Sequence, residues 1–246
     1  MAKRIVAAPL EKKVGIRIYT VDIPWQRGMS TIQKRENISI LHKVAAEILG
    51  KSSRILEIST KSPDSLGRAL SSFNLVIDLE RLLKPEQLFE LGCVKLPVEI
   101  VFQGSKVFKG SEPHLVKFSN WDKKDWWKVK KSLPKGNTLI AFDLLGDRWP
   151  LEPKTAFYDW LYINALVQNP TVAEKLLEFD AFTDIEFNPE RAYNCQAVSA
   201  AIYVYLRKAG ILPSTVEVLT RKDFISLMET EGLYSKVRLQ NYVEEG

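Results

Sequence analysis

The order of helical and strand-like segments is the feature that most constrains the fold of this chain. Segments with the apolar spacing of an amphipathic helix outnumber the β-branched segments typical of strands, and the two kinds do not alternate strictly. The 246 residues contain no internal repeat and no long linker. The sequence therefore predicts an α+β fold, a single and mostly helical domain over residues 1–246 with a small sheet. Residues 211–246 are expected to pack on it as a C-terminal appendage.

The predicted elements follow from periodicity and from residues that begin or end helices. Strands are predicted at residues 16–23 ("IRIYTVDI"), 54–59 and 136–145. Helices are predicted at residues 31–50, 84–92, 97–108, 155–168, 169–179 and 194–210, and residues 62–75 are predicted to form a short helix followed by a loop. Ser62 and Asn194 are the expected N-caps of their helices, and Gly50 and Gly210 are expected to end theirs.

Composition limits the class of protein. Hydrophobic residues make up 46% of the chain, which supports a proper core. No apolar run reaches the roughly 18 residues of a membrane span, and the start, "MAKRIVAAPLEKKVG", lacks the apolar stretch of a secretory signal. Cys93, Cys195, His42 and His114 are the only cysteines and histidines, and they show no zinc-site spacing. We therefore expect a protein of the reducing cytoplasm, with no membrane contact and no metal.

The charge balance favours an anionic partner without deciding which one. The net charge is +5 and the isoelectric point is about 9.0, which is compatible with nucleic acid, nucleotide or phosphate. The chain has no GxGxxG, Walker A, GxSxG or HExxH motif. Dehydrogenase, P-loop NTPase, serine esterase and zincin activities therefore have no support in the sequence.

The stretch "PVEIVFQGSKVF" (97–108) carries the first candidate site. If it forms one helix, Glu99, Gln103 and Lys106 lie at i, i+4 and i+7 on one polar face. By spacing alone such a face is usually solvated. Gly104, however, costs about 1 kcal/mol in a helix interior, and it indicates a backbone that another group approaches closely. A partly sheltered carboxylate and amine there could serve as acid, base or Schiff-base partner.

Two further stretches have both a structural and a functional interpretation. The run "AFTDIEFNPERAYN" (181–194) is either a hydrogen-bonded turn or a loop that holds Asp184 opposite the Glu99 row. The stretch 155–168 places Phe157 and Trp160 on one side of a helix, where they either belong to the core or stack on a base.

Residues 120–131, "NWDKKDWWKVKK", form what we call the basic segment. Lysines interleaved with tryptophans can follow phosphates and stack on bases, or they can form an exposed amphipathic helix whose tryptophans pack inward. The candidate DNA contacts in this segment are Lys123, Lys124, Trp126, Lys128, Lys130 and Lys131.

Several motifs occur in an order that resembles a known family. The pattern Glu99-x-x-Phe102-Gln103-x-x-Lys106 resembles the "EHYFQAxKF" helix of the NADAR (YbiA-like) superfamily. "LSSFNL" (70–75) is similar to its "LSNF" segment, and "NPTVAEKLL" to its "NPxLxxxLL" helix. Asp184 and the helix from Asn194 resemble its C-terminal "D…N-x-LG…R" region. The resemblance is strongest over residues 55–212.

Longer runs resemble one branch of this superfamily more closely. "FQGSKVF", "TAFYDWLYINAL" and "FTDIEFNPERAYNCQA" look closest to the NADAR antitoxins paired with DarT-type DNA ADP-ribosyltransferase toxins. Ile100 replaces the histidine that follows the superfamily's glutamate, and "IEFNP" replaces the Trp-Gly after its aspartate. These departures argue for a branch distinct from YbiA itself.

The resemblance implies a hydrolase of N-glycosidic bonds that removes ADP-ribose from guanine bases in DNA. Such an enzyme would be a DNA-repair antitoxin to a DarT-type toxin, and it would need no cofactor. Glu99 would shuttle protons, Lys106 would attack as an amine, and Asp184 would activate water or hold ribose hydroxyls. Direct displacement through an oxocarbenium-like state stays open as the alternative mechanism. The implied substrate contacts are Ser72, Phe73, Asn74, Gln103, Phe157, Trp160 and Asn194.

Two other functions compete with this one. The chain could hydrolyse ribosylamino-pyrimidine intermediates of riboflavin synthesis, in which case the lysines of the basic segment would have no role. It could instead be a non-catalytic module that reads ADP-ribose or masks a toxin, and then replacing Glu99 or Lys106 would leave protection intact.

Overall fold

The computed structural model describes residues 1–10, 15–28 and 30–230 and contains three small sheets. The largest has the strand order β2 (Ile16–Ile23), β1 (Ala2–Pro9), β9 (Ala181–Thr183) and β3 (Ile55–Glu57). Its strands are antiparallel except for β3 and β9, which run parallel. The other sheets pair β4 (Val76–Asp78) with β5 (Lys95–Pro97), and β6 (Lys106–Phe108) with β7 (Leu139–Leu144) and β8 (Asp147–Trp149).

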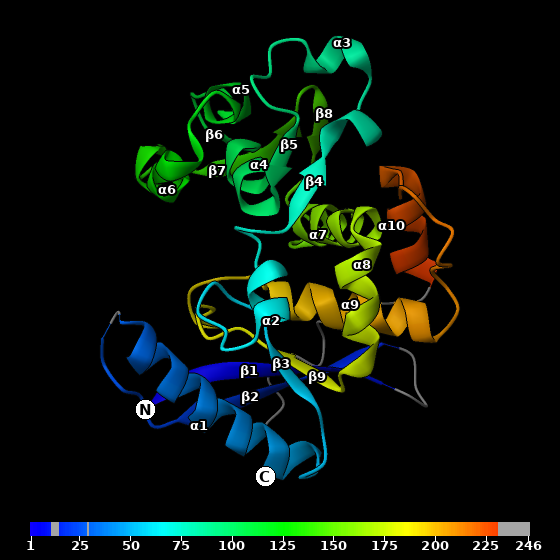
Figure 1. Cartoon of the computed structure of the whole chain (residues 1–246). Helices are drawn as coiled ribbons and strands as arrows, with labels where there is room; N and C mark the ends of the chain where they lie inside the picture. Colours follow the sequence, from blue (N-terminus) through cyan, green and yellow to red (C-terminus); the bar gives the residue numbers. More distant parts are fainter. Residues whose placement is uncertain (11–14, 29, 231–246) are drawn as a thin grey trace.

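Helices cover both faces of the largest sheet (Figure 1). Side chains alternate between faces along a strand. In β1, Val6 and Ala8 therefore belong to the cluster formed with α1 (Thr31–Leu49), whereas Ile5 and Ala7 belong to the main core with α9 (Gln196–Lys208). This sandwich is the lower half of the molecule in Figure 1.

A buried helix joins this sandwich to the upper half. Every residue of α7 (Ala156–Gln168) from Ala156 to Leu166 is buried, and the helix packs against α9 on one side and α4 (Val98–Gly104) on the other. Aromatic rings fill the contact with α4: the centroids of Phe102 on α4 and Tyr158 on α7 are 5.0 Å apart. Because α4 is packed on this helix, its residues are held inside the molecule.

The remaining helical elements are short and connect these layers. They are α2 (Ser65–Ala69), η1 (Leu79–Arg81), α3 (Pro85–Leu88), α5 (Leu115–Ser119), η2 (Lys123–Lys128), α6 (Val129–Ser132), α8 (Pro170–Ala173), η3 (Glu174–Glu178) and α10 (Arg221–Thr230). Among the described residues, no helix combines the length and apolar character that crossing a membrane requires.

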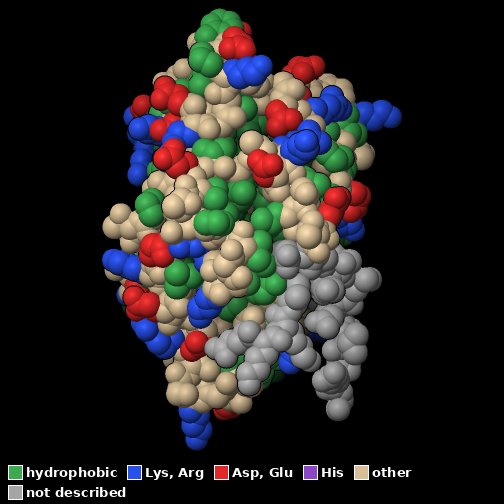
Figure 2. Space-filling model, turned by 90° about the vertical axis from the view of Figure 1, so that its right-hand side faces the viewer, with side chains coloured by type: hydrophobic (Ala, Val, Ile, Leu, Met, Phe, Trp, Pro, Cys, Tyr) green, Lys and Arg blue, Asp and Glu red, His purple; other side chains and the backbone are tan. Residues whose placement is uncertain are grey.

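The C-terminal region contributes to the core as far as the structure describes it. Phe224 and Met228 on α10 are buried in the main hydrophobic cluster, and the carbonyl of Leu219 accepts hydrogen bonds from Trp160 and Asn164 of α7. Figure 2 shows this face, with hydrophobic side chains gathered in its middle. Residues 231–246 of the predicted appendage lie outside the described residues.

The predicted α+β fold is confirmed, and several element boundaries need correction. The strand at 16–23 and the helices at 31–50 and 155–168 form as expected, but strand β1 was not predicted. The helix predicted at 97–108 ends at Gly104, and Lys106 begins strand β6.

Two predicted helix caps are also wrong. The N-cap of α2 is Asp64 rather than Ser62, because the Asp64 carboxylate accepts the backbone N–H of Leu66 at 2.7 Å. The N-cap of α9 is Cys195 rather than Asn194, and its side chain makes no capping bond.

Gly104 is required by close packing, as its position in the sequence indicated. A Cβ atom there would lie 2.8 Å from the backbone Cα of Leu115 on α5. We expect Gly104→Ala to destabilise the protein by about 1–3 kcal/mol, although alanine is the better helix former. Denaturant unfolding measures this change, and the exposed Lys43→Ala on α1 is the control, expected within about 0.5 kcal/mol of wild type. An unchanged midpoint for Gly104→Ala would contradict the packing argument.

Candidate active site

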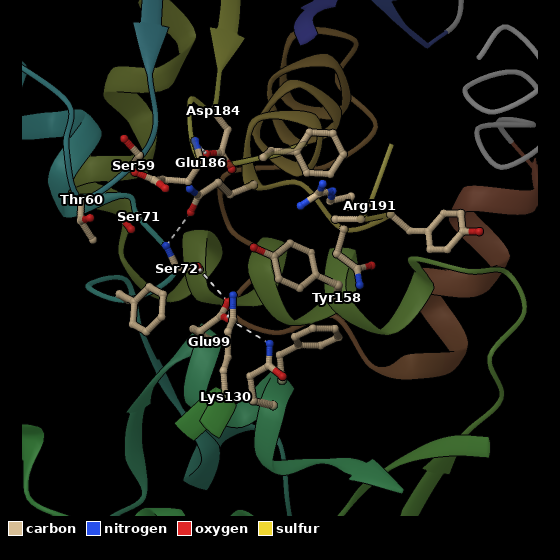
Figure 3. Close-up of a pocket in the computed structure, with 18 of the residues that line it drawn as sticks. Ser59, Thr60, Ser71, Ser72, Glu99, Lys130, Tyr158, Asp184, Glu186 and Arg191 are labelled. Carbon is tan, nitrogen blue, oxygen red and sulfur yellow. Dashed lines mark hydrogen bonds and ion pairs between the residues drawn. The ribbon is translucent and has the colours of Figure 1, made fainter. Parts of the chain in front are cut away.

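A cavity of about 730 Å³ opens where the two halves of the molecule meet, and we call it the central pocket (Figure 3). Its walls come from α1, the turn after β3, the segment before β4, α4, β6, the region of α6, α7, the loop after β9 and the start of α9. A volume of this size falls within the range of small-molecule sites.

Glu99 is the centre of the lower wall. Its carboxylate is nearly buried, with a side chain 9% exposed, and three groups hold it. Ser72 Oγ donates to Oε2 at 3.2 Å, Gln103 Nε2 donates to Oε1 at 3.0 Å, and the Lys130 ammonium lies 3.4 Å from Oε1. The Glu99 and Gln103 side chains therefore form a wall of the pocket and do not face solvent.

Lys106 follows at the start of β6 and also lines the pocket. The antiparallel pairing of β6 with β7 positions Lys106 opposite Phe142. The Lys106 ammonium lies 4.8 Å from the ring centroid of Phe102. Burial lowers the pKa of Lys106; the nearby Glu99 carboxylate opposes this shift and the charge of Lys130 adds to it. A lysine of lowered pKa has more of the free amine, which is the nucleophilic form.

Two buried carboxyl groups lie on the opposite side: Asp184 lines the pocket, and Glu57 lies beside it outside the lining. The parallel pairing of β3 with β9 sets Glu57 opposite Thr183, whose hydroxyl donates to Glu57 Oε2 at 2.6 Å. Glu57 Oε1 accepts the Ile185 N–H at 2.9 Å. Burial raises the pKa of the adjacent Asp184, and the negative charge of Glu57 raises it further. Burial raises the pKa of Glu57 as well, but hydrogen bonds from Ile185, Thr183 and Ser59 oppose that shift. The pKa of Asp184 is raised well above its ordinary value although Glu186 and Gln196 donate to it, so we assign the proton that the pair retains to Asp184.

Gln196 ties the two walls together. Its Oε1 accepts the backbone N–H of Ser72 at 2.7 Å, and its Nε2 donates to the carbonyl of Ile58 at 2.7 Å. Tyr158 of α7 lies between the walls in Figure 3, and burial raises its pKa well above the usual value, with the charge of Glu99 adding to the shift. Tyr158 is therefore a neutral phenol in the middle of the pocket.

Comparison with protein families identifies the chain. A model of the DarT1-associated NADAR antitoxins matches residues 2–237. The chain belongs to this family. Its description supports the antitoxin role and the pairing with a DarT1 toxin. A search of curated proteins found no match.

The pocket of this NADAR protein gathers most of the side chains expected from the sequence. Glu99, Lys106 and Asp184, the three candidate catalytic residues, all line it. The other predicted residues in its lining are Ser72, Phe73, Gln103, Lys130 and Asn194.

Three of the predicted substrate contacts lie outside the lining of the NADAR pocket. Asn74 is exposed and donates to the carbonyl of Arg68 at 2.7 Å. Phe157 and Trp160 are buried in the aromatic core, because α7 is enclosed along most of its length. The structure therefore places the aromatic stripe of this helix in the core.

The basic segment includes η2 and most of α6, and some of its side chains are exposed whereas others pack against the core. Lys123, Lys124, Lys128 and Lys131 are exposed. Trp126 packs against the core, whereas Trp127, which the sequence did not single out, is 61% exposed. The ammonium groups of Lys128 and Lys131 lie 5.6 and 4.9 Å from the centroid of the Trp127 ring.

Several pocket residues of this NADAR protein were missed, and one had a readable signal. Lys34 and Asn37 occupy the buried stripe of α1 together with Ile38, Leu41 and Ala45, so a charged residue stands where the helical period requires an apolar one. The Lys34 ammonium reaches Glu186 at 3.2 Å. Tyr158, Gln196 and Arg191 gave no comparable signal, because only contacts distant in sequence bring them into the lining. The same holds for Glu57, which lies outside the lining beside Asp184.

Proposed function

We propose that this NADAR protein hydrolyses the N-glycosidic bond between ADP-ribose and guanine in DNA, and so reverses the modification made by its partner toxin. One observation carries the proposal: Glu99 on α4, Lys106 on β6 and Asp184 after β9 line a single cavity, although they lie on three separate elements. Their environments also differ, since burial favours a free amine on Lys106 and a proton on Asp184. An amine and an acid in one pocket suit the cleavage of an aminal.

In the proposed reaction the ribose first opens. Asp184 donates its proton to the ribose ring oxygen, and the C1″–O bond breaks to leave an imine between C1″ and the guanine nitrogen. The Lys106 amine adds to C1″, and Glu99 takes a proton from the new ammonium and gives it to the guanine nitrogen. The bond from C1″ to guanine then breaks with its electron pair on nitrogen, and a Schiff base with Lys106 remains.

Water completes the cycle. The Asp184 carboxylate takes a proton from water as the water oxygen adds to C1″ of the Schiff base. The proton of the new hydroxyl then passes to the Lys106 nitrogen, and the bond from C1″ to that nitrogen breaks with its electron pair on nitrogen, which leaves an aldehyde at C1″. ADP-ribose leaves with its ring closed again, and the lysine returns as a free amine. The balance is one water consumed, with one ADP-ribose and one unmodified guanine formed.

Polar groups in the pocket support a nucleotide ligand. Lys34, Lys61 and Arg191 line it and supply positive charge for a diphosphate. Within the part of the chain that the structure describes, the buried oxygens Gln103 Oε1 and Asn194 Oδ1 have no hydrogen-bond partner. Buried polar atoms are almost always paired, so these two fit a site that a ligand completes. The exposed lysines of the basic segment are the proposed contacts to the DNA backbone.

The test is release of ADP-ribose from an oligonucleotide modified at one guanine. We expect wild type to release it, and Glu99→Gln to lower kcat by about 10²- to 10⁴-fold, because glutamine keeps the shape but cannot shuttle a proton. The affinity of Glu99→Gln for the modified oligonucleotide should stay within a few fold. The control is Glu90→Gln, which changes an exposed carboxylate outside the pocket.

One result separates hydrolysis from masking. If folded wild type releases nothing, while wild type and Glu99→Gln suppress the toxin equally, the protein acts by binding and the proposal is wrong.

A further inference from the structure

Lys130 differs from the other lysines of the basic segment in where its charge lies. Its side chain on α6 is 66% exposed, yet its ammonium lies 3.4 Å from the carboxylate of Glu99, whose side chain is only 9% exposed. Lys124 and Lys128 instead pair with Asp122 and Asp125 on the outer surface. Of the lysines in this segment, Lys130 is the one that lines the central pocket. Its position is therefore that of a pocket residue.

The ion pair between Lys130 and Glu99 matters for the chemistry of the pocket more than for the stability of the fold. Ion pairs with an exposed partner contribute only about 0–1 kcal/mol. In the pocket, however, Lys130 is a second cation close to Lys106. Two ammonium groups in one site disfavour each other, and the more buried one gives up its proton more easily. Burial of Lys106 and the charge of Lys130 act in the same direction on its pKa.

We propose that Lys130 is a positioning residue of the reaction, which holds the Glu99 carboxylate in place and puts a second positive charge into the pocket that Lys106 lines. This inference rests on the proposed function, because it gives a task to Glu99 and Lys106. It also removes Lys130 from the predicted DNA contacts. The segment that contacts DNA in the proposed function would then supply one lysine to the pocket itself.

A test of Lys130 must distinguish its effect on the titration of Lys106 from the effects of the other ionisable groups in the pocket. Glu99 of α4 and Lys130 of α6 act on it directly. The remaining ionisable groups that line the pocket are Lys34, Lys61, Tyr158, Asp184, Glu186, Arg191 and Tyr193. Variants of Lys130 leave all of these in place, so a changed titration of Lys106 would come from Lys130.

The first test compares the pH profiles of release for Lys130→Ala, Lys130→Arg and wild type. We expect Lys130→Ala to lower kcat near pH 7 and to move the rising limb of the profile to higher pH, because loss of the neighbouring positive charge leaves less of Lys106 as the free amine. KM and its salt dependence should stay as in wild type. Lys130→Arg should restore the position of the limb, since it keeps the charge.

Two further lysines give the comparison its reference points. Lys135→Ala removes an exposed charge outside both the pocket and the predicted DNA contacts, and it should match wild type. Lys128→Ala removes a predicted DNA contact, so it should raise KM. The slope of the logarithm of DNA affinity against the logarithm of salt concentration should become less steep by about one. If Lys130→Ala gives the Lys128→Ala result, with an unshifted pH profile, Lys130 contacts DNA and the inference is wrong.

A second test needs no turnover. The pH dependence of acetylation of Lys106 by acetic anhydride, read by mass spectrometry of its peptide, reports its titration directly. We expect the pH at the midpoint of Lys106 acetylation to rise in Lys130→Ala. In Lys130→Arg and Lys135→Ala this pH should equal that of wild type. An unchanged midpoint in Lys130→Ala would overturn the inference even if the proposed reaction were absent. A shifted midpoint without ADP-ribose release would instead overturn the proposed function alone.

Discussion

Replacing Lys106 by alanine is expected to abolish release of ADP-ribose, with kcat lowered roughly 10³-fold or more, because the proposed nucleophile is lost. The remaining pocket keeps Glu99 with its partners Ser72 and Gln103, so substrate binding should persist. Borohydride added during turnover should reduce the Schiff base and link ADP-ribose to wild type. Mass spectrometry should find the adduct on Lys106, and Lys106→Ala should form none.

The control for this experiment is the residue directly after strand β6. Lys109 is exposed, and its backbone N–H bonds to Thr138 whatever its side chain, so Lys109→Ala should retain both release and trapping. Release by Lys106→Ala at the wild-type rate, with no adduct in either protein, would contradict the amine mechanism. It would leave a hydrolase that works by direct displacement.

The position of Lys106 shows what the sequence could and could not predict. Glu99 and Gln103 do share a face of α4, as the spacing of four residues requires. Lys106 reaches the same pocket, but not as the next turn of that helix. The chain leaves the helix at Gly104 because β6 pairs with β7, where Lys106 lies opposite Phe142. That pairing joins segments 36 residues apart, and local periodicity carries no information about it.

The opposite wall was less predictable for the same reason. Ser72 bonds to Gln196 across 124 positions, and Glu57 bonds to Ile185 across 128. Each of these residues looks ordinary in its local segment, and only the register of β3 with β9 brings Glu57 beside Asp184. Asp184 itself was predicted from a family motif. The carboxyl group that alters its pKa belongs to another strand.

Asp184→Asn is expected to make the protein more stable and less active. Asparagine has the same shape and can still accept the N–H of Glu186, which Asp184 Oδ1 accepts at 3.0 Å. It removes a buried group whose charged form is disfavoured by burial and by Glu57. We expect the free energy of unfolding to rise by about 1 kcal/mol at pH 8, or roughly 2–4 °C in Tm. Release should fall about 10²-fold, because an amide cannot transfer the proton.

The stability gained by Asp184→Asn should depend on pH. The pKa of Asp184 is raised on folding from its ordinary 3.8, so wild type loses stability as the pH rises from that value towards the raised one. Asp184→Asn does not have this loss. Its advantage in Tm should therefore vanish near pH 4 and be largest at alkaline pH. Asp22→Asn, on the exposed side of β2, should show no such trend.

A lower Tm for Asp184→Asn at pH 8 would mean that the charged carboxylate stabilises the fold, and the assignment of a proton to Asp184 would be wrong. Higher stability with unchanged release would keep the proton on Asp184 but remove it from the reaction. Only the combined result fits an acid held in place at the expense of stability. That combination is typical of residues kept for function, because a carboxyl group disfavoured by its surroundings persists only where its chemistry is needed.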